Sequence, residues 1–201
     1  MKIDYLADAL DHWKGSLFEY LQSENALRDL GVDPMATDRD QWNDADFCLY
    51  ARLLRVGRDQ IISHGTPLLF RDCYFAEIDC LGDIFLDPDT GIGKGSPIEK
   101  YVKPKELATL LSSTPGRVIA VYQHVRARTT RDCVDKCIAD VDRQVEIGGW
   151  CSYEPPSVAM IFLCGVDSRT REIAAALESL LGRHADRRVR SGPNRRPIAA
   201  S

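Results

Sequence analysis

Apolar side chains recur every three or four positions in five segments of the chain, which is the spacing of helices that bury one face. These segments are residues 4–22, 47–54, 105–111, 133–145 and 168–181. Gly15 interrupts the first segment, which predicts either one helix or two short helices that meet at Lys14 and Gly15. Capping residues flank three of the segments: Asp44 or Asp46, Thr129 or Thr130, and Gly182.

Shorter and nearly continuous apolar runs predict strands that are buried on both faces. The clearest run is residues 118–122. The others are residues 30–32, 73–78, 83–86 and 158–164. Because strands and helices alternate along residues 1–182, we expect a single α/β domain of three layers, Rossmann-like, with a mainly parallel sheet and helices on both faces.

The composition is that of one globular domain. The chain has 201 residues, of which 44% are hydrophobic and 28% are charged, so it can bury a core, and disordered, collagen-like and small disulfide-rich proteins are excluded. The seven cysteines are odd in number and irregularly spaced, which favours reduced thiols over disulfides. Neither a long apolar run nor a basic start followed by an apolar stretch is present, so we expect no membrane association and a cytoplasmic location.

Charge is unevenly distributed along the chain. The net charge is −4, but residues 183–201 carry six arginines against Asp186, a local +5 that leaves −9 on residues 1–182. We expect residues 183–201 to be a flexible basic tail. Such a tail either attracts nucleic acid, folds back onto the acidic body, or is simply solvated.

Polar side chains follow two of the predicted strands, and ligands of open α/β sheets bind beyond the carboxyl ends of the strands. The strand at 83–86 ends in Asp87-Pro88-Asp89-Thr90-Gly91, and the strand at 118–122 ends in Gln123-His124-Val125-Arg126. We take three of these residues as candidate catalytic groups: Asp87, Asp89 and His124. The candidate substrate-binding residues are Arg126, Gln123, Thr90, Gly91 and Lys14. The alternative is an ordinary turn that ends a strand, with Asp87 bonded to the backbone.

Each candidate group has a defined chemistry. The two carboxylates can hold Mg²⁺, or one can raise the pKa of the other and make it a general base. His124 can exchange protons near neutral pH, and Arg126 can bind a phosphate in bidentate fashion. Lys14 reaches a phosphate in one interpretation and lies on a solvated helix face in the commoner one.

The two strand ends resemble a family of bacterial and phage proteins of unassigned activity. In that family one strand ends in Asp-Pro-Asp-(Asn or Thr)-Gly and a later strand ends in Tyr-Gln-His, as Phe85 to Gly91 and Val121 to His124 do here. The likeness spans residues 4–128 and includes Lys14-Gly15-Ser16-Leu17. It identifies relatives and implies no reaction.

A wider resemblance is to the class I S-adenosylmethionine-dependent methyltransferases. In those that act on amino groups of nucleobases, a strand ends in Asp-Pro-Pro-Tyr, and helix, strand, helix, strand, strand follow. Asp87-Pro88-Asp89-Thr90 is in the equivalent place, but Asp89 replaces the second proline and no aromatic residue follows. The glycine-rich loop of the family is missing, because Gly91, Gly93 and Gly95 follow a different strand and predict a mobile loop.

Three functions are therefore open. The first is a methyltransferase-like enzyme that acts on nucleic acid or a nucleotide, with S-adenosylmethionine as cofactor. The second is a Mg²⁺-dependent phosphodiester or nucleotide hydrolase that uses Asp87, Asp89, His124 and Arg126. The third is a non-catalytic binding protein on the same fold.

Overall fold

The computed structural model describes residues 1–62, 64, 66–78, 82–125 and 129–192. The helices are α1 (Ala9–Ser23), α2 (Asp44–Leu53), α3 (Arg71–Ala76), α4 (Pro104–Ser113), α5 (Thr130–Asp142) and α6 (Asp167–Leu181). Short 3₁₀ turns are η1 (Ile3–Tyr5), η2 (Arg39–Gln41), η3 (Arg58–Gln60), η4 (Ile98–Lys100) and η5 (Gly182–Arg187). The strands are β1 (Gly31–Asp33), β2 (Ile84–Leu86), β3 (Gly91–Ile92), β4 (Tyr101–Val102), β5 (Ile119–His124), β6 (Gly149–Tyr153), β7 (Val158–Cys164) and β8 (Val189–Gly192).

Six strands form the central sheet in the order β1-β2-β5-β7-β6-β8. β2 pairs in parallel with β1 and with β5, whereas β7 is antiparallel to β5 and β6, and β8 is antiparallel to β6. Four of the six strands, β1, β2, β5 and β6, run in the same direction, as a mainly parallel sheet requires. The pairs formed by β7 and β8 are antiparallel, so the expectation is wrong for the pairing of the strands that follow β5 in the sheet. The reason is the short connection from Tyr153 to Val158, which permits only a hairpin, since a parallel pair needs a longer crossover.

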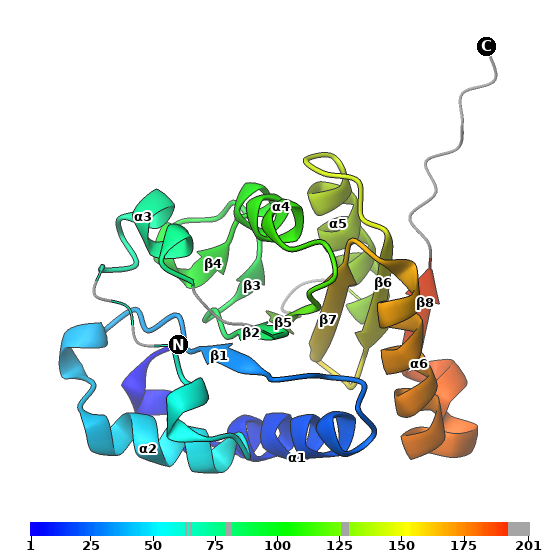
Figure 1. Cartoon of the computed structure of the whole chain (residues 1–201), viewed down its shortest axis with the longest axis horizontal. Helices are drawn as coiled ribbons and strands as arrows, with labels where there is room; N and C mark the ends of the chain where they lie inside the picture. Colours follow the sequence, from blue (N-terminus) through cyan, green and yellow to red (C-terminus); the bar gives the residue numbers. More distant parts are fainter. Residues whose placement is uncertain (63, 65, 79–81, 126–128, 193–201) are drawn as a thin grey trace.

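Helices cover both faces of the sheet, as expected, and make a three-layered mixed α/β fold (Figure 1). Alternate strand residues point to opposite faces, so Phe85 packs in the cluster that includes α1, α2 and α6, while its neighbours Ile84 and Leu86 pack in the cluster that includes α3, α4 and α5. β2, β5 and β7 are buried on both sides, which explains their continuous apolar runs. None of the helices in the described part of the chain has the length and apolarity needed to cross a membrane.

The first helix is continuous through Gly15. Asp8 caps α1 by accepting hydrogen bonds from the backbone of Leu10 and Asp11. A Cβ at Gly15 would lie 1.8 Å from the carbonyl oxygen of Leu53, so the missing side chain lets α1 approach the end of α2. Gly15 is thus a packing position and not a helix break.

Two sequence predictions of local structure are wrong, and one strand of the body was not predicted. Residues 73–78, expected as a strand, lie largely in α3, because Tyr74 and Phe75 pack against the core from one face of a helix, and tertiary packing outweighs their preference for strands. Residues 149–153 form β6, which the sequence analysis did not predict. The glycine cluster at 91–95, expected as a mobile loop, contributes β3, which pairs with β4.

Residues 183–192, expected to belong to a flexible tail, are part of the fold. Residues 182–187 form η5, and β8 pairs with β6 in the register Cys151 to Ser191. Arg190 forms ion pairs with Glu154 and Asp135, each at 2.6 Å, so the acidic body neutralises this arginine. The remaining tail, residues 193–201, lies outside the described residues.

Candidate functional site

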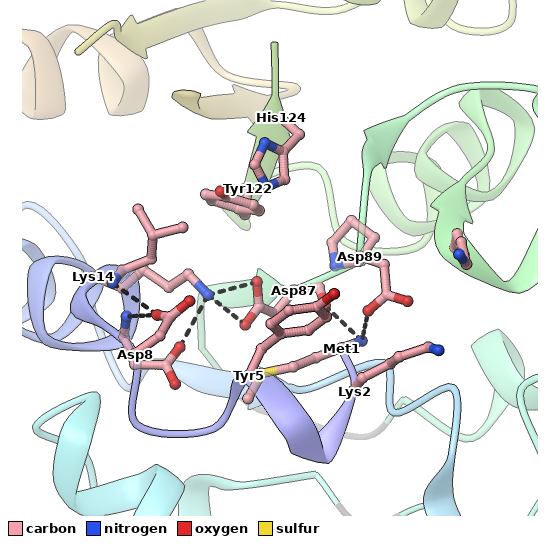
Figure 2. Close-up of a pocket in the computed structure, with 13 residues that line it drawn as sticks. Met1, Lys2, Tyr5, Asp8, Lys14, Asp87, Asp89, Tyr122 and His124 are labelled. Carbon is pink, nitrogen blue, oxygen red and sulfur yellow. Dashed lines mark hydrogen bonds and ion pairs between the residues drawn. The ribbon is translucent and has the colours of Figure 1, made fainter. Parts of the chain in front are cut away.

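A cavity of about 290 Å³ opens where the carboxyl ends of β2 and β5 meet the start of α1 (Figure 2). Four predicted site residues line it: Lys14, Asp87, Asp89 and His124. Its other lining residues are Met1, Lys2, Tyr5, Asp8, Leu10, Asp11, Pro88, Lys100 and Tyr122. The predicted residues Thr90, Gly91 and Gln123 do not line this cavity, and Arg126 lies outside the described residues.

Asp87 is held firmly at the end of β2. Its side chain accepts two hydrogen bonds from Lys14 Nζ, at 2.9 and 2.7 Å, and one from the Tyr50 hydroxyl at 2.6 Å. Its backbone NH donates to the carbonyl of Asp33, which joins the ends of β1 and β2. Only 2% of the residue is exposed, so its charge depends on these partners for stabilisation.

Lys14 is a buried cation and not the solvated lysine of the commoner interpretation. Its ammonium also contacts Asp11 at 3.2 Å and lies 4.7 Å from the centre of the Tyr122 ring. Burial alone lowers the pKa of this ammonium, but the charges of Asp87 and Asp11 outweigh burial and raise the pKa above its ordinary value. Lys14 therefore remains charged at neutral pH and balances Asp87.

Asp11 and Tyr50 complete the buried cluster around Lys14. Burial raises the pKa of the Asp11 carboxyl, and Lys14 partly opposes this shift. Burial, followed by the charge of Asp87, raises the pKa of Tyr50 well above its usual value, so the phenol keeps its proton and remains a hydrogen-bond donor. We call Asp11, Lys14, Tyr50 and Asp87 the lysine cluster.

Asp89 lies at the wall of the cavity and binds an amino group. Its carboxylate is 3.0 Å from the α-ammonium of Met1 and accepts a hydrogen bond from Thr37. The same ammonium donates to the carbonyls of Pro34, Met35 and Asp87. The carboxyl ends of β1 and β2 thus present several oxygen acceptors to one cation, as Figure 2 shows for Met1 and Asp89.

Gln123 braces the loop after β2. Its amide nitrogen donates to the carbonyls of Thr90 and His124, and its amide oxygen accepts from the backbone NH of Ile92 at 2.8 Å. Gly91 has a φ of 123°, and a Cβ there would lie 2.3 Å from the Gln123 oxygen. Glycine and glutamine at these positions therefore fix the backbone that carries Asp87 and Asp89, and the structure gives both a positioning role.

His124 ends β5 and is half-buried. Its ring meets the Tyr122 ring edge-on, with the centroids 5.4 Å apart. Its backbone NH donates to the carbonyl of Thr90, so β5 also holds the loop after β2 through this bond. Because the imidazole lines the cavity, it can contact a ligand there.

A second buried cluster lies at the end of β1. Asp33 accepts hydrogen bonds from the Tyr74 hydroxyl at 2.6 Å and the backbone NH of Met35, and it contacts His64 Nε2 at 3.0 Å. The His64 ring stacks on Tyr74 at 3.6 Å. We call Asp33, His64 and Tyr74 the histidine cluster. Sequence reasoning missed it because Asp33, His64 and Tyr74 are far apart along the chain and no motif connects them.

The lysine cluster does not fit a magnesium site. A Mg²⁺ ion bound by the Asp87 carboxylate would compete with Lys14 Nζ, which bonds both of its oxygens. Among the described residues, no group of three or more His, Cys, Asp and Glu side chains is placed to hold a metal ion. Asp89, the other predicted ligand, is paired with the α-ammonium of Met1.

The chain after β1 also does not fit S-adenosylmethionine as the methyltransferase resemblance implies. In place of a glycine-rich loop, β1 continues into Pro34 and Met35, and the Met35 side chain is fully buried. The carbonyls of both residues bind the α-ammonium of Met1. The backbone there is covered by the protein's own side chains and terminus, so it does not form an open cradle for a ligand.

Comparison with known proteins gives little further information. No family model matches the chain, and no curated protein matches it. A similar solved structure is the crystal structure of protein LPL1258 from Legionella pneumophila str. Philadelphia 1, described as family-model DUF519. The two chains are 12% identical, with a TM-score of 0.43, and the match covers 85% of this chain and 62% of that chain. A TM-score this low establishes neither a family nor a function for this chain.

Proposed function

We propose that this protein binds a nucleotide, either free or as one unit of a nucleic acid, in the cavity at the ends of β2 and β5. The observation that carries the proposal is the combination of aromatic rings and free lysines around this cavity. The rings belong to Tyr5, Tyr122 and His124, and the lysines are Lys2 and Lys100. A nucleobase stacks on such rings, and a phosphate pairs with such lysines.

The charges around the cavity support an anionic ligand. The acidic side chains inside are already bonded: Lys14 contacts both Asp87 and Asp11, the Met1 ammonium pairs with Asp89, and Asp8 accepts hydrogen bonds from the backbone at the start of α1. Lys2 and Lys100 have no ion-pair partner among the residues that the structure describes. These two lysines are therefore the cations of the cavity that remain available to pair with a phosphate.

A second candidate is methyl transfer to an amino group of a nucleobase. It is favoured by the order of elements after the Asp-Pro end of β2. Once the short β3, η4 and β4 are passed, the chain runs α4, β5, α5, β6 and β7, the order that the methyltransferase resemblance implies. Three of the four hydrogen-bonding positions of the Asp87 carboxylate are used, so one position stays open for an amino group. Because the chain after β1 does not fit the cofactor, we derive no catalytic step and leave this candidate to the experiment.

The experiment is a thermal-shift series with nucleoside monophosphates, and separately with S-adenosylmethionine and with Mg²⁺. A ligand at about a hundred times its Kd adds roughly 2.7 kcal/mol, which raises the Tm of a chain of this size by about 5 to 10 °C. We expect this shift with a nucleotide, and a smaller one in Lys2→Ala and Lys100→Ala. Lys105→Ala is the matched control, because Lys105 is exposed and lines neither this cavity nor the one described below.

The other ligands distinguish the alternatives. A shift with S-adenosylmethionine supports the methyltransferase candidate, and a shift with Mg²⁺ alone supports the hydrolase. No shift with any nucleotide, confirmed by calorimetric titration, overturns the nucleotide proposal and leaves a protein that binds some other ligand.

A further inference from the structure

A second cavity, of about 390 Å³, lies beside the first. Its lining residues are Thr90, Ile92, Gly93, Lys94, Tyr101, His124, Val125, Cys133, Lys136, Cys137 and Asp140. His124 lines both cavities. The segments at residues 89–90 and 100–101 form the wall between the cavities, because consecutive residues of each segment line different cavities. Asp89 and Lys100 line the first cavity, and the residues that follow them, Thr90 and Tyr101, line the second.

The wall between the cavities is rigidly built. The backbone NH of Thr90 donates to the carbonyl of Lys100 at 2.9 Å, and β3 pairs with β4 directly beyond this bond. Gly93 and Gly95 lie against the Tyr101 ring, and a Cβ at Gly95 would be 2.4 Å from it. The glycines therefore let this segment close over the ring.

The second cavity repeats the charge pattern of the first. Lys94 and Lys136 are exposed at its edge and have no ion-pair partner within the described ranges. Its one carboxylate, Asp140, pairs with Arg143. The buried cations Arg71 and Arg169, by contrast, are paired with Glu106 and Asp83. Each of the two cavities thus has two lysines in its lining that are available to a phosphate.

We propose that the second cavity binds the nucleotide adjacent to the one in the first cavity, so that together they form a groove for single-stranded nucleic acid. This inference rests on the proposed nucleotide site and names its substrate class. Each cavity is near the lower end of the size of small-ligand sites, and two such cavities with a common wall suit a ligand that repeats one unit along a chain. Tyr101 and His124 provide rings for a second base, and Lys94 and Lys136 provide contacts for the phosphates.

A single strand fits this arrangement and a duplex does not. In a duplex the bases are stacked on one another and paired, so their flat faces cannot enter cavities in a protein wall. An unpaired strand exposes each base, and neighbouring bases can enter neighbouring cavities while the backbone passes over the lysines. The groove therefore distinguishes strands by shape and charge and not by sequence.

The test compares a fluorescent single strand of about ten nucleotides with a nucleoside monophosphate and with the duplex of the same sequence. We expect the full chain to bind the single strand more tightly than the monophosphate and the duplex. The double variant Lys94→Ala/Lys136→Ala should reduce the slope of log K against log salt by about 1.4, since each lost phosphate contact of a single strand accounts for about 0.7. Monophosphate binding in the first cavity, which Lys2→Ala and Lys100→Ala weaken, should not change in this variant, and Lys105→Ala should change neither the salt slope nor that binding.

The outcomes separate this inference from the proposed function. If the monophosphate binds but the strand binds no more tightly, or if the double variant keeps the wild-type salt slope, the second cavity is not a nucleotide site, while the first proposal stands. If neither the monophosphate nor the strand binds, both proposals fail. Equal binding of the duplex overturns the single-strand inference.

Discussion

Two carboxylates end neighbouring parallel strands in this molecule, and their surroundings differ in an instructive way. Asp33 ends β1 and Asp87 follows β2, both are almost fully buried, and each accepts a hydrogen bond from a tyrosine hydroxyl at 2.6 Å. Asp87 is balanced by the ammonium of Lys14, whereas Asp33 has the imidazole of His64. The same local pattern thus occurs twice, once with a permanent cation and once with a group that is charged only when protonated.

The two clusters also differ in what lies beside them. The lysine cluster borders the cavity of about 290 Å³, whereas the cavity that His64 and Tyr74 line is only about 20 Å³. A cavity of that size has room for a water molecule and not for a ligand. A buried carboxylate at a strand end is therefore not sufficient for a ligand site, and its surroundings decide whether it serves binding or stability.

The largest loss of unfolding free energy is expected when the ammonium of Lys14 is removed. Lys14→Met leaves Asp87 and Asp11 buried without a cation, and breaking a buried ion pair in this way costs about 3 to 5 kcal/mol. Urea unfolding followed by circular dichroism measures the change. Lys105→Met is the control, since that lysine is exposed and should change stability by less than about 0.5 kcal/mol. A loss below about 1 kcal/mol for Lys14→Met would show that the cluster does not depend on its cation.

The next largest loss of unfolding free energy is expected when the tyrosine of either cluster is replaced, and this pair of variants compares the two clusters directly. Tyr50→Phe and Tyr74→Phe each remove one hydrogen bond to a buried carboxylate, which costs about 1.5 to 3 kcal/mol. Because the two bonds have the same length, we expect similar losses of unfolding free energy. A much larger loss for Tyr50→Phe would mean that the lysine cluster acts as a coupled unit, whereas the histidine cluster does not.

Replacing the imidazole should have a smaller effect than replacing the ammonium. His64→Leu removes one contact of Asp33 but leaves the hydrogen bonds from Tyr74 and from the Met35 backbone. We expect a loss of about 1 kcal/mol in the same unfolding measurement. A loss as large as that of Lys14→Met would contradict the view that His64 is a weaker partner.

The smallest expected effect is that of pH on the lysine cluster. The pKa of Lys14 is raised above 10.5, because the charges of Asp87 and Asp11 outweigh burial. For a cation with a raised pKa, the stabilisation is complete below the ordinary value and is lost as pH rises through the folded value. The difference in unfolding free energy between wild type and Lys14→Met should therefore be constant from about pH 7 to pH 10. A decline already near pH 8 would show that Lys14 is not held as a cation.

Sequence reasoning placed Asp87, Asp89 and His124 at one edge of the sheet, where they line one cavity, but it did not predict the contacts that these residues make. Apolar runs that end in Asp87 and His124 were enough to predict two strand ends at one edge, because a buried strand is readable from its composition. The burial of Lys14 was not predicted, although a signal was present. Lys14 lies three residues before Leu17 and seven before Leu21, on the apolar stripe of α1. A charged residue on such a stripe needs a buried partner, and that partner came from β2.

The rest depended on contacts between distant segments, which no local pattern encodes. β6 and β8 were missed because each is short and bordered by glycine or charged residues, and their pairing in the sheet makes them strands. Asn43 caps α2 in place of the predicted Asp44 or Asp46, a shift of one residue within a run of suitable capping residues. The hydrogen bonds from Gln123 to the loop after β2 were not predicted either, because a polar residue at a strand end is equally consistent with contact to a ligand.

The brace formed by Gln123 leaves position 91 closed to any side chain for two independent reasons. The Gln123 amide fills the space that a Cβ there would need, and the backbone φ of 123° is one that glycine adopts readily and other residues rarely do. Shortening Gln123 would remove the first obstacle and leave the second, so glycine is required at this position whatever stands at 123.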